Sequence, residues 1–146
     1  MKTTLSARHI EALHWFDENV GAEIGWPAPL ADGTLLATKA KGIYKPRWTQ
    51  YALSVRHSIR GPYPDRDLVV EGGSWTYKYF QENLDIRSLR DEYTNRGLLA
   101  CIEDGVPVGV LVQTSARPET RYQVMGLADV VRWEDGYFLL RGRKQA

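Results

Sequence analysis

The pattern that most constrains the fold is a long apolar segment at residues 122–133, followed by Glu134-Asp-Gly136 and a second apolar run at 137–141. Asp-Gly between two apolar runs is a strong local signal for a β-hairpin, because Asp and Gly tolerate the positive φ angles of its tight turn. We therefore expect two antiparallel strands at the end of the chain.

Other segments also read as strands, because they alternate or are continuously apolar and are bounded by Gly, Pro or Asp. They lie at 35–39, 51–56, 75–79 and 106–112. Hairpins with few helices predict a strongly curved sheet or a partly closed barrel. The expected fold class is thus α+β, with about six or seven strands.

Two helices are predicted. The first is amphipathic and runs from Ser6, a plausible N-cap, to Val20, and Gly21 ends it. Its core face is expected to carry Ile10, Leu13, Phe16 and Val20. The second helix is expected around 89–104, ends at Gly105, and would face a core with Leu89, Tyr93, Leu99 and Ile102.

The composition fits one globular domain. The chain has 146 residues, of which 43% are hydrophobic and 25% charged, and it contains no apolar run near the length of a membrane span. The N-terminus lacks the apolar core of a signal peptide, so a cytoplasmic location is the default expectation. The single cysteine, Cys101, lies in an apolar run and is interpreted as a core residue rather than a nucleophile.

We find no catalytic motif in the sequence. His9, His14 and His57 do not have the spacing of metal ligands, and no P-loop, GxGxxG or GxSxG motif is present. No metal site, no cofactor and no catalytic residue is therefore expected. A binding module is favoured over an enzyme.

Aromatic and basic residues are concentrated in the middle of the chain. Residues 42–80 hold 8 of the 16 aromatic residues, and residues 39–66 hold seven Lys or Arg against one acid. Cations that contact phosphates and aromatic rings that stack on bases are typical of nucleic-acid surfaces. A tyrosine-rich β core with a solvated basic face would give the same composition, so both interpretations stay open here.

Several short motifs follow one another along residues 40–142. They are Gly42-Ile43, Tyr51-Ala-Leu-Ser54, Gly61-Pro-Tyr-Pro-Asp65, Trp75-Thr-Tyr77, Thr94-Asn-Arg96, Gly105-Val-Pro-Val108, Arg121-Tyr-Gln-Val-Met-Gly-Leu127 and Trp133-Glu-Asp-Gly-Tyr-Phe138. In this order they resemble SRA (SET and RING associated, or YDG) domains. The first forty residues resemble a bacterial subgroup in which such a domain precedes an HNH nuclease in modification-dependent restriction enzymes.

The resemblance implies a PUA-like, saddle-shaped β-barrel that binds double-stranded DNA containing 5-methylcytosine or 5-hydroxymethylcytosine and flips the modified base into a pocket. It implies one domain over 1–146, with an N-terminal helix and loop at 1–38, an SRA core at 39–142 and a tail or linker at 143–146. The expected partners are modified DNA and, in a longer protein, a fused HNH nuclease; no membrane partner is expected. The expected location is the bacterial nucleoid within the cytoplasm.

The resemblance also assigns the modified-base pocket. Tyr63 and Tyr77 would sandwich the base, and Asp65 would accept the cytosine N4 hydrogen, with Asp67 as the substitute. Thr76 would donate to the base or close the pocket. Arg66 stands where the family usually has a second aspartate, which leaves the exact modification open.

DNA contacts are assigned to two loops and to scattered cations. The first loop carries Lys45, Pro46, Arg47 and Trp48, and Arg47 or Trp48 would fill the gap left by the flipped base. The second loop carries Arg87 and Arg90, although the family's Asn-Lys-Arg run is missing there. The further phosphate candidates are Lys39, Lys41, Arg56, Arg60 and Arg66.

Three other classes remain as alternatives. They are a PUA-like RNA-binding module, a small enzyme acting on nucleotides or a modified base, and a structural interaction domain. Binding of methylated duplex in competition with RNA separates the first of these from a DNA reader.

Overall fold

The computed structural model describes residues 5–58, 69–71, 74–116 and 118–144, and its strands join in one sheet. The strands are β1 (Glu23–Ile24), β2 (Ile43–Tyr44), β3 (Ser54–His57), β4 (Val69–Glu71), β5 (Ser74–Phe80), β6 (Val108–Ser115), β7 (Arg121–Glu134) and β8 (Tyr137–Gly142). The helices are α1 (Ala7–Glu18), the 3-10 helix η1 (Ile86–Asp91) and α2 (Tyr93–Asp104).

The predicted C-terminal hairpin is confirmed. Residues Glu134 and Tyr137 pair across a two-residue turn, in which Asp135 has a φ of 50° and Gly136 a φ of 93°. Two consecutive positive φ angles are what a type I′ turn requires, and this turn matches the twist of the flanking strands.

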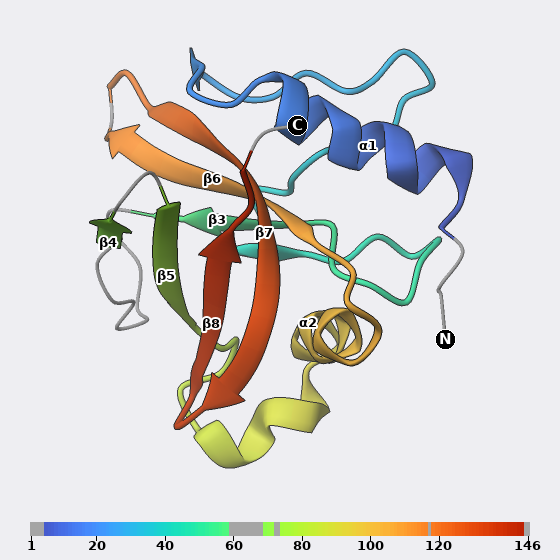
Figure 1. The fold of residues 1–146 in the computed structure, drawn as a ribbon, viewed down its shortest axis with the longest axis vertical. Helices are drawn as coiled ribbons and strands as arrows, with labels where there is room; N and C mark the ends of the chain where they lie inside the picture. Colours follow the sequence, from blue (N-terminus) through green and yellow to red (C-terminus); the bar gives the residue numbers. More distant parts are fainter. Residues whose placement is uncertain (1–4, 59–68, 72–73, 117, 145–146) are drawn as a thin grey trace.

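The sheet curls into a half-barrel, as expected for a PUA-like α+β fold (Figure 1). Its order is β2-β3-β6-β7-β8-β5-β4, and β1 pairs with the start of β7. The register shifts between Val110 and Leu111 in β6 and between Val130 and Arg132 in β7. Irregularities of this kind bend a strand and increase its twist, which helps the sheet to curl.

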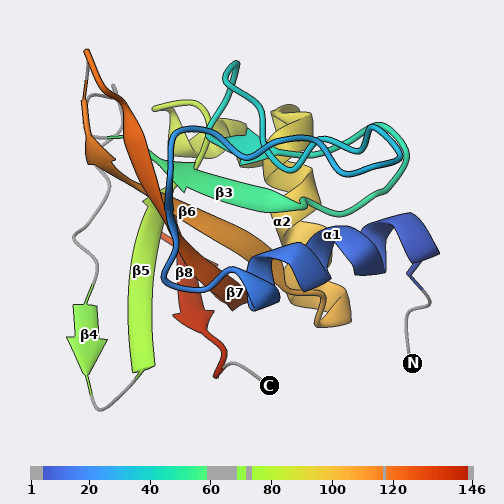
Figure 2. The same ribbon diagram turned by 90° about the horizontal axis from the view of Figure 1, so that it is seen from above.

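One pairing differs from the expected run of hairpins. Strand β3 pairs in parallel with β6, and β4, β5, η1 and α2 all lie between them in the sequence (Figure 2). A parallel pair needs a long crossover connection, which a local turn signal does not reveal. The short strand predicted at 35–39 is absent. Those residues form a loop, in which Leu36 and Ala37 are buried.

Helix α1 begins as predicted, but its buried face is rotated. The Ser6 hydroxyl oxygen accepts a hydrogen bond from the His9 backbone N–H at 3.2 Å. Leu13 and Phe16 are buried as expected, whereas Ile10 and Val20 are 55% and 42% exposed. The buried positions also include His9 and Ala12.

The second predicted helix is interrupted. Glu92 has extended backbone angles (φ −97°, ψ 120°) and separates η1 from α2, which ends at Gly105 as predicted. Tyr93 is 45% exposed, contrary to its predicted core position, while Leu89, Leu99 and Ile102 are partly buried against the core.

The core has two clusters. One contains α2 residues with Val55, Tyr77 and Phe138, and the other contains α1 residues with Leu111 and Tyr122. Cys101 is 1% exposed and belongs to the first cluster, which confirms its interpretation as a core residue. In the part of the chain that the structure describes, no helix combines the length and apolar character of a membrane span.

Candidate nucleic-acid interface

Strand β3 presents its two faces to different environments. His57 contacts the ring of Tyr77 edge-on, with 5.7 Å between the ring centroids, and Arg56 lies 5.7 Å from the centroid of the Trp26 ring. Because successive side chains of a strand point to opposite faces, Arg56 and Tyr77 lie on opposite sides of β3. The predicted contact residues thus lie on both sides of β3.

Tyr77 is part of the first core cluster. It is 2% exposed and its ring also contacts Tyr79 edge-on, with 6.2 Å between the centroids. Thr76, its neighbour on β5, is partly exposed and points to the other face of the strand. The backbone therefore does not direct Thr76 and Tyr77 into the same space.

The other residues assigned to the modified-base pocket lie outside the described residues. They are Tyr63, Asp65 and Asp67. The phosphate candidates Arg60 and Arg66 also fall in this segment, 59–68. Their positions stay predictions.

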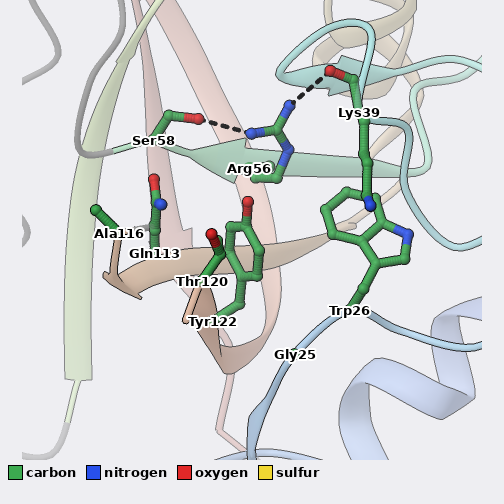
Figure 3. Close-up of a pocket in the computed structure, with 9 residues that line it drawn as sticks. All are labelled: Gly25, Trp26, Lys39, Arg56, Ser58, Gln113, Ala116, Thr120 and Tyr122. Atoms are coloured by element: carbon green, nitrogen blue, oxygen red, sulfur yellow. Dashed lines mark hydrogen bonds between the residues drawn. The ribbon is translucent and has the colours of Figure 1, made fainter. Parts of the chain in front are cut away.

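An open cavity of about 600 Å³ lies on the Arg56 side of β3 (Figure 3). Its lining residues are Gly25, Trp26, Lys39, Arg56, Ser58, Gln113, Ala116, Thr120 and Tyr122. Trp26 contacts the ring of Tyr122 edge-on at 5.5 Å, and Lys39 Nζ lies 5.2 Å from the Trp26 centroid. Two predicted phosphate ligands, Lys39 and Arg56, are thus brought together around one indole ring.

The predicted groove loop after β2 is tied to the protein. Lys45 Nζ donates to the carbonyl oxygens of Thr49 at 2.6 Å and Pro46 at 3.3 Å. Burial, and to a lesser degree the nearby positive charge of Arg96, lower the pKa of Lys45. Lys45 therefore closes its own loop rather than extending freely into solvent.

Trp48 and Arg47, in the same loop, differ in exposure. The Trp48 ring contacts His9 edge-on at 5.6 Å, and the Arg8 guanidinium lies 4.6 Å from its centroid. Arg47 is exposed. Of the two residues proposed to fill a vacated base position, Arg47 is the one that extends from the surface.

A second basic and aromatic surface surrounds Tyr93 at the start of α2. Lys41 Nζ and Lys45 Nζ lie 5.5 and 5.7 Å from the centroid of its exposed ring. Arg96 is exposed on the same helix and donates to the carbonyl oxygen of Arg90 at 2.7 Å. We call Lys41, Lys45, Tyr93 and Arg96 the Tyr93 surface.

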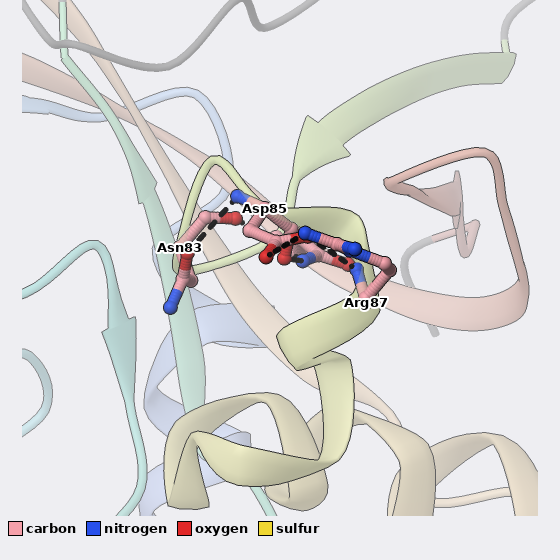
Figure 4. A network of polar contacts seen from close by, with 4 residues as sticks. Asn83, Asp85 and Arg87 are labelled. Atoms are coloured by element: carbon pink, nitrogen blue, oxygen red, sulfur yellow. Dashed lines mark hydrogen bonds and ion pairs between the residues drawn. The ribbon is translucent and has the colours of Figure 1, made fainter.

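Arg87 lies in a polar network at the start of η1 (Figure 4). Its Nε and one terminal nitrogen donate to the two carboxylate oxygens of Asp85 at 3.0 and 3.1 Å. This hydrogen bonding, with the opposite charge, raises the pKa of Arg87 and lowers that of Asp85. Arg90, the other cation predicted for this loop, is exposed.

The sequence did not identify Trp26, Tyr122 and Gln113 as cavity-lining residues, or Tyr93 as an exposed residue. Trp26 lies in a Pro-rich loop, and Tyr122 was assigned only to a strand. The pairing of β1 with β7 brings them together, and no local pattern encodes that pairing. No group of His, Cys, Asp and Glu among the described residues is arranged to hold a metal ion.

No family model and no curated protein matches the chain. Two solved structures do. The crystal structure of KRYPTONITE in complex with mCHH DNA, H3(1-15) peptide and SAH has a TM-score of 0.52 and 19% identity, covering 94% of this chain and 37% of that one. The crystal structure of KRYPTONITE in complex with mCHG DNA and SAH has a TM-score of 0.50 and 17% identity, covering 94% of this chain and 38% of that one. This chain thus spans less than two fifths of either, and at these identities the likeness concerns the fold.

Proposed function

We propose that this chain is an SRA-like reader of modified cytosine in double-stranded DNA. The observation that carries the proposal is its half-barrel fold, which is similar to chains crystallised with mCHH and mCHG DNA. The basic and aromatic surfaces around Trp26 and Tyr93 support a nucleic-acid partner.

In this proposal the modified base leaves the duplex and enters a pocket beside Tyr77. A C5 substituent inside a duplex shows only its groove edge, so recognition from all sides requires extrusion, at a cost of a few kcal/mol that stacking and edge hydrogen bonds offset. Tyr63 would stack on the other face of the base, and Asp65 would accept from its N4 group. Tyr77 is held by His57 and Tyr79, which would fix its ring before DNA binds.

The DNA backbone would lie along exposed cations. Arg47, Arg90 and the Lys41 and Arg96 side chains of the Tyr93 surface are exposed. Cations of this kind supply sequence-independent, salt-sensitive affinity. The chain's own role would be binding without catalysis, and in a longer protein it would direct a nuclease to modified DNA in the bacterial nucleoid.

A fluorescence titration at fixed salt tests the proposal with three matched duplexes that carry cytosine, 5-methylcytosine or 5-hydroxymethylcytosine. We expect tighter binding to one modified duplex, and loss of that preference in Tyr77→Ala and in Asp65→Ala. Circular dichroism of Tyr77→Ala checks its folding, because Tyr77 is buried.

The matched control is Tyr93→Ala, which removes an exposed tyrosine from the Tyr93 surface. It should weaken binding to all three duplexes by a similar factor. Equal affinity of the unchanged protein for the three duplexes would refute modified-base reading, and stronger binding to a competing RNA would favour the RNA-binding alternative.

A further inference from the structure

The cavity beside Trp26 combines cations and aromatic rings. Among the described residues, its lining includes Lys39 and Arg56 but no Asp or Glu. No ion pair with a described residue is formed by either cation. The acceptors that Arg56 has among the described residues are uncharged: Ser58 Oγ at 2.6 Å and the carbonyl oxygens of Thr38 and Lys39 at 3.4 Å. Within the described part of the chain, the positive charge at the cavity is therefore not compensated by an acid.

These hydrogen bonds hold the Arg56 guanidinium in place before any ligand binds. A guanidinium has five N–H donors and binds phosphate oxygens in a fixed geometry. The bond to Ser58 uses one hydrogen of one terminal nitrogen, and the two bonds from the other terminal nitrogen are long at 3.4 Å, whereas Nε is buried. Donor capacity thus remains beside the cavity.

The remaining walls suit a planar, polar group next to that charge. Trp26 and Tyr122 meet edge-on, and Gln113 and Thr120 add an amide and a hydroxyl (Figure 3). A volume of about 600 Å³ has the size of a small-molecule site. A nucleotide presents both features that such walls recognise, an anionic phosphate and a planar base.

We propose that this cavity is a second nucleotide site, in which Lys39 and Arg56 bind the phosphate and Trp26 and Tyr122 contact the base or sugar. It lies on the face of β3 opposite Tyr77, so it is separate from the proposed modified-base pocket. The nucleotide is either a free mononucleotide or one unit of a DNA strand. The proposal that the nucleotide belongs to a DNA strand rests on the proposed function, whereas the proposal of a nucleotide site does not.

The test follows the Trp26 indole N–H by ¹⁵N NMR, with its signal assigned from Trp26→Phe. The probes are 2′-deoxycytidine 5′-monophosphate, deoxycytidine, inorganic phosphate and an unmodified duplex. We expect the monophosphate to shift the Trp26 signal at lower concentration than either the nucleoside or phosphate alone. If the duplex competes with the monophosphate, a DNA strand is the source of the nucleotide. If the duplex does not compete, the site binds a free nucleotide.

Arg56→Gln should weaken binding of the monophosphate by about tenfold, because it removes a charge-assisted hydrogen bond. Lys39→Gln, at an exposed position, provides a second variant if Arg56→Gln folds poorly. The control is Lys144→Gln, which removes an exposed charge elsewhere and should leave the shift unchanged.

No shift of the Trp26 signal with any phosphate-bearing probe would overturn the proposal, as would equal weakening by Arg56→Gln and Lys144→Gln. Failure of the proposed function gives a different result. In that case the protein would bind modified and unmodified duplexes equally, while the effect of Arg56→Gln on the monophosphate would persist.

Discussion

The ring of Phe16 in α1 packs directly on the backbone of Gly109 in β6, so that any Cβ at position 109 would overlap the ring. Phe16 is fully buried, and Gly109 donates its backbone N–H to the carbonyl oxygen of Leu53 at 2.9 Å. This contact joins the N-terminal helix to the centre of the sheet. The contact is possible because glycine has no Cβ.

Gly109→Ala should therefore destabilise the protein by about 1–3 kcal/mol, the usual cost of overpacking a core. Urea unfolding measures the change. Gly25→Ala is the control, since the nearest atom to its new Cβ would be 4.0 Å away, and it should change stability by less than about 0.5 kcal/mol. Gly109→Ala should cost less when combined with Phe16→Leu, and additive effects of the two changes would contradict a direct clash.

We expect His9 to make the stability of the protein depend on pH. It is 1% exposed, lies against the rings of Trp48 and Tyr51, and neither ring nitrogen has a hydrogen-bond partner among the described residues. Burial lowers the pKa of His9 below its ordinary value of 6.5. His9 therefore binds a proton more readily in the unfolded chain than in the folded one. The free energy of unfolding should not change with His9 protonation above pH 6.5, and should decrease as the pH falls below 6.5.

Urea midpoints at several pH values between 5 and 8 would measure this decline, using the range in which histidine titrates. His9→Leu should flatten the decline. His14→Gln is the control, because His14 is exposed on the same helix and pairs with Glu18 at 2.6 Å. An unchanged pH profile in His9→Leu would assign the effect to other groups.

Local signals predicted the parts of this fold that depend on neighbouring residues. The Asp135-Gly136 turn and the Ser6 cap are encoded within a few positions, and both formed as expected. The buried face of α1 is decided by its fit to the sheet, which selected His9 over Ile10. The cavity beside Trp26 depends on β1 reaching β7, a long-range pairing that periodicity does not specify.

Cys101 should be chemically inert in the folded protein. Burial raises the pKa of its thiol to about 12, so the reactive thiolate is about a thousandfold scarcer at pH 8 than in an unfolded chain. Alkylation by iodoacetamide, followed by mass spectrometry, should be very slow without denaturant and fast in urea. Rapid alkylation of the native protein would show that α2 opens readily from the core.

The ion pair between Asp85 and Arg87 is expected to restrain DNA binding by the second loop. Asp85 accepts hydrogen bonds from two nitrogens of the exposed Arg87 guanidinium, and it adds a negative charge where phosphate would approach. Asp85→Asn keeps an oxygen that can accept the Arg87 backbone N–H, which now bonds Asp85 Oδ1 at 3.0 Å, so η1 should keep its cap.

Asp85→Asn should therefore strengthen duplex binding by about two- to fivefold at low salt, the range of a single exposed charge interaction. Arg87→Gln should weaken binding and reduce the slope of log affinity against log salt by about 1, as expected for one lost phosphate contact. Titrations at several salt concentrations measure both effects, with Arg132→Gln as a control on the β7–β8 hairpin, where Arg132 similarly pairs with Glu134 at 3.3 Å. If Asp85→Asn and Arg87→Gln both leave affinity and salt slope unchanged, this loop does not contact DNA, and the exposed cations of the Tyr93 surface would have to carry the backbone contacts instead.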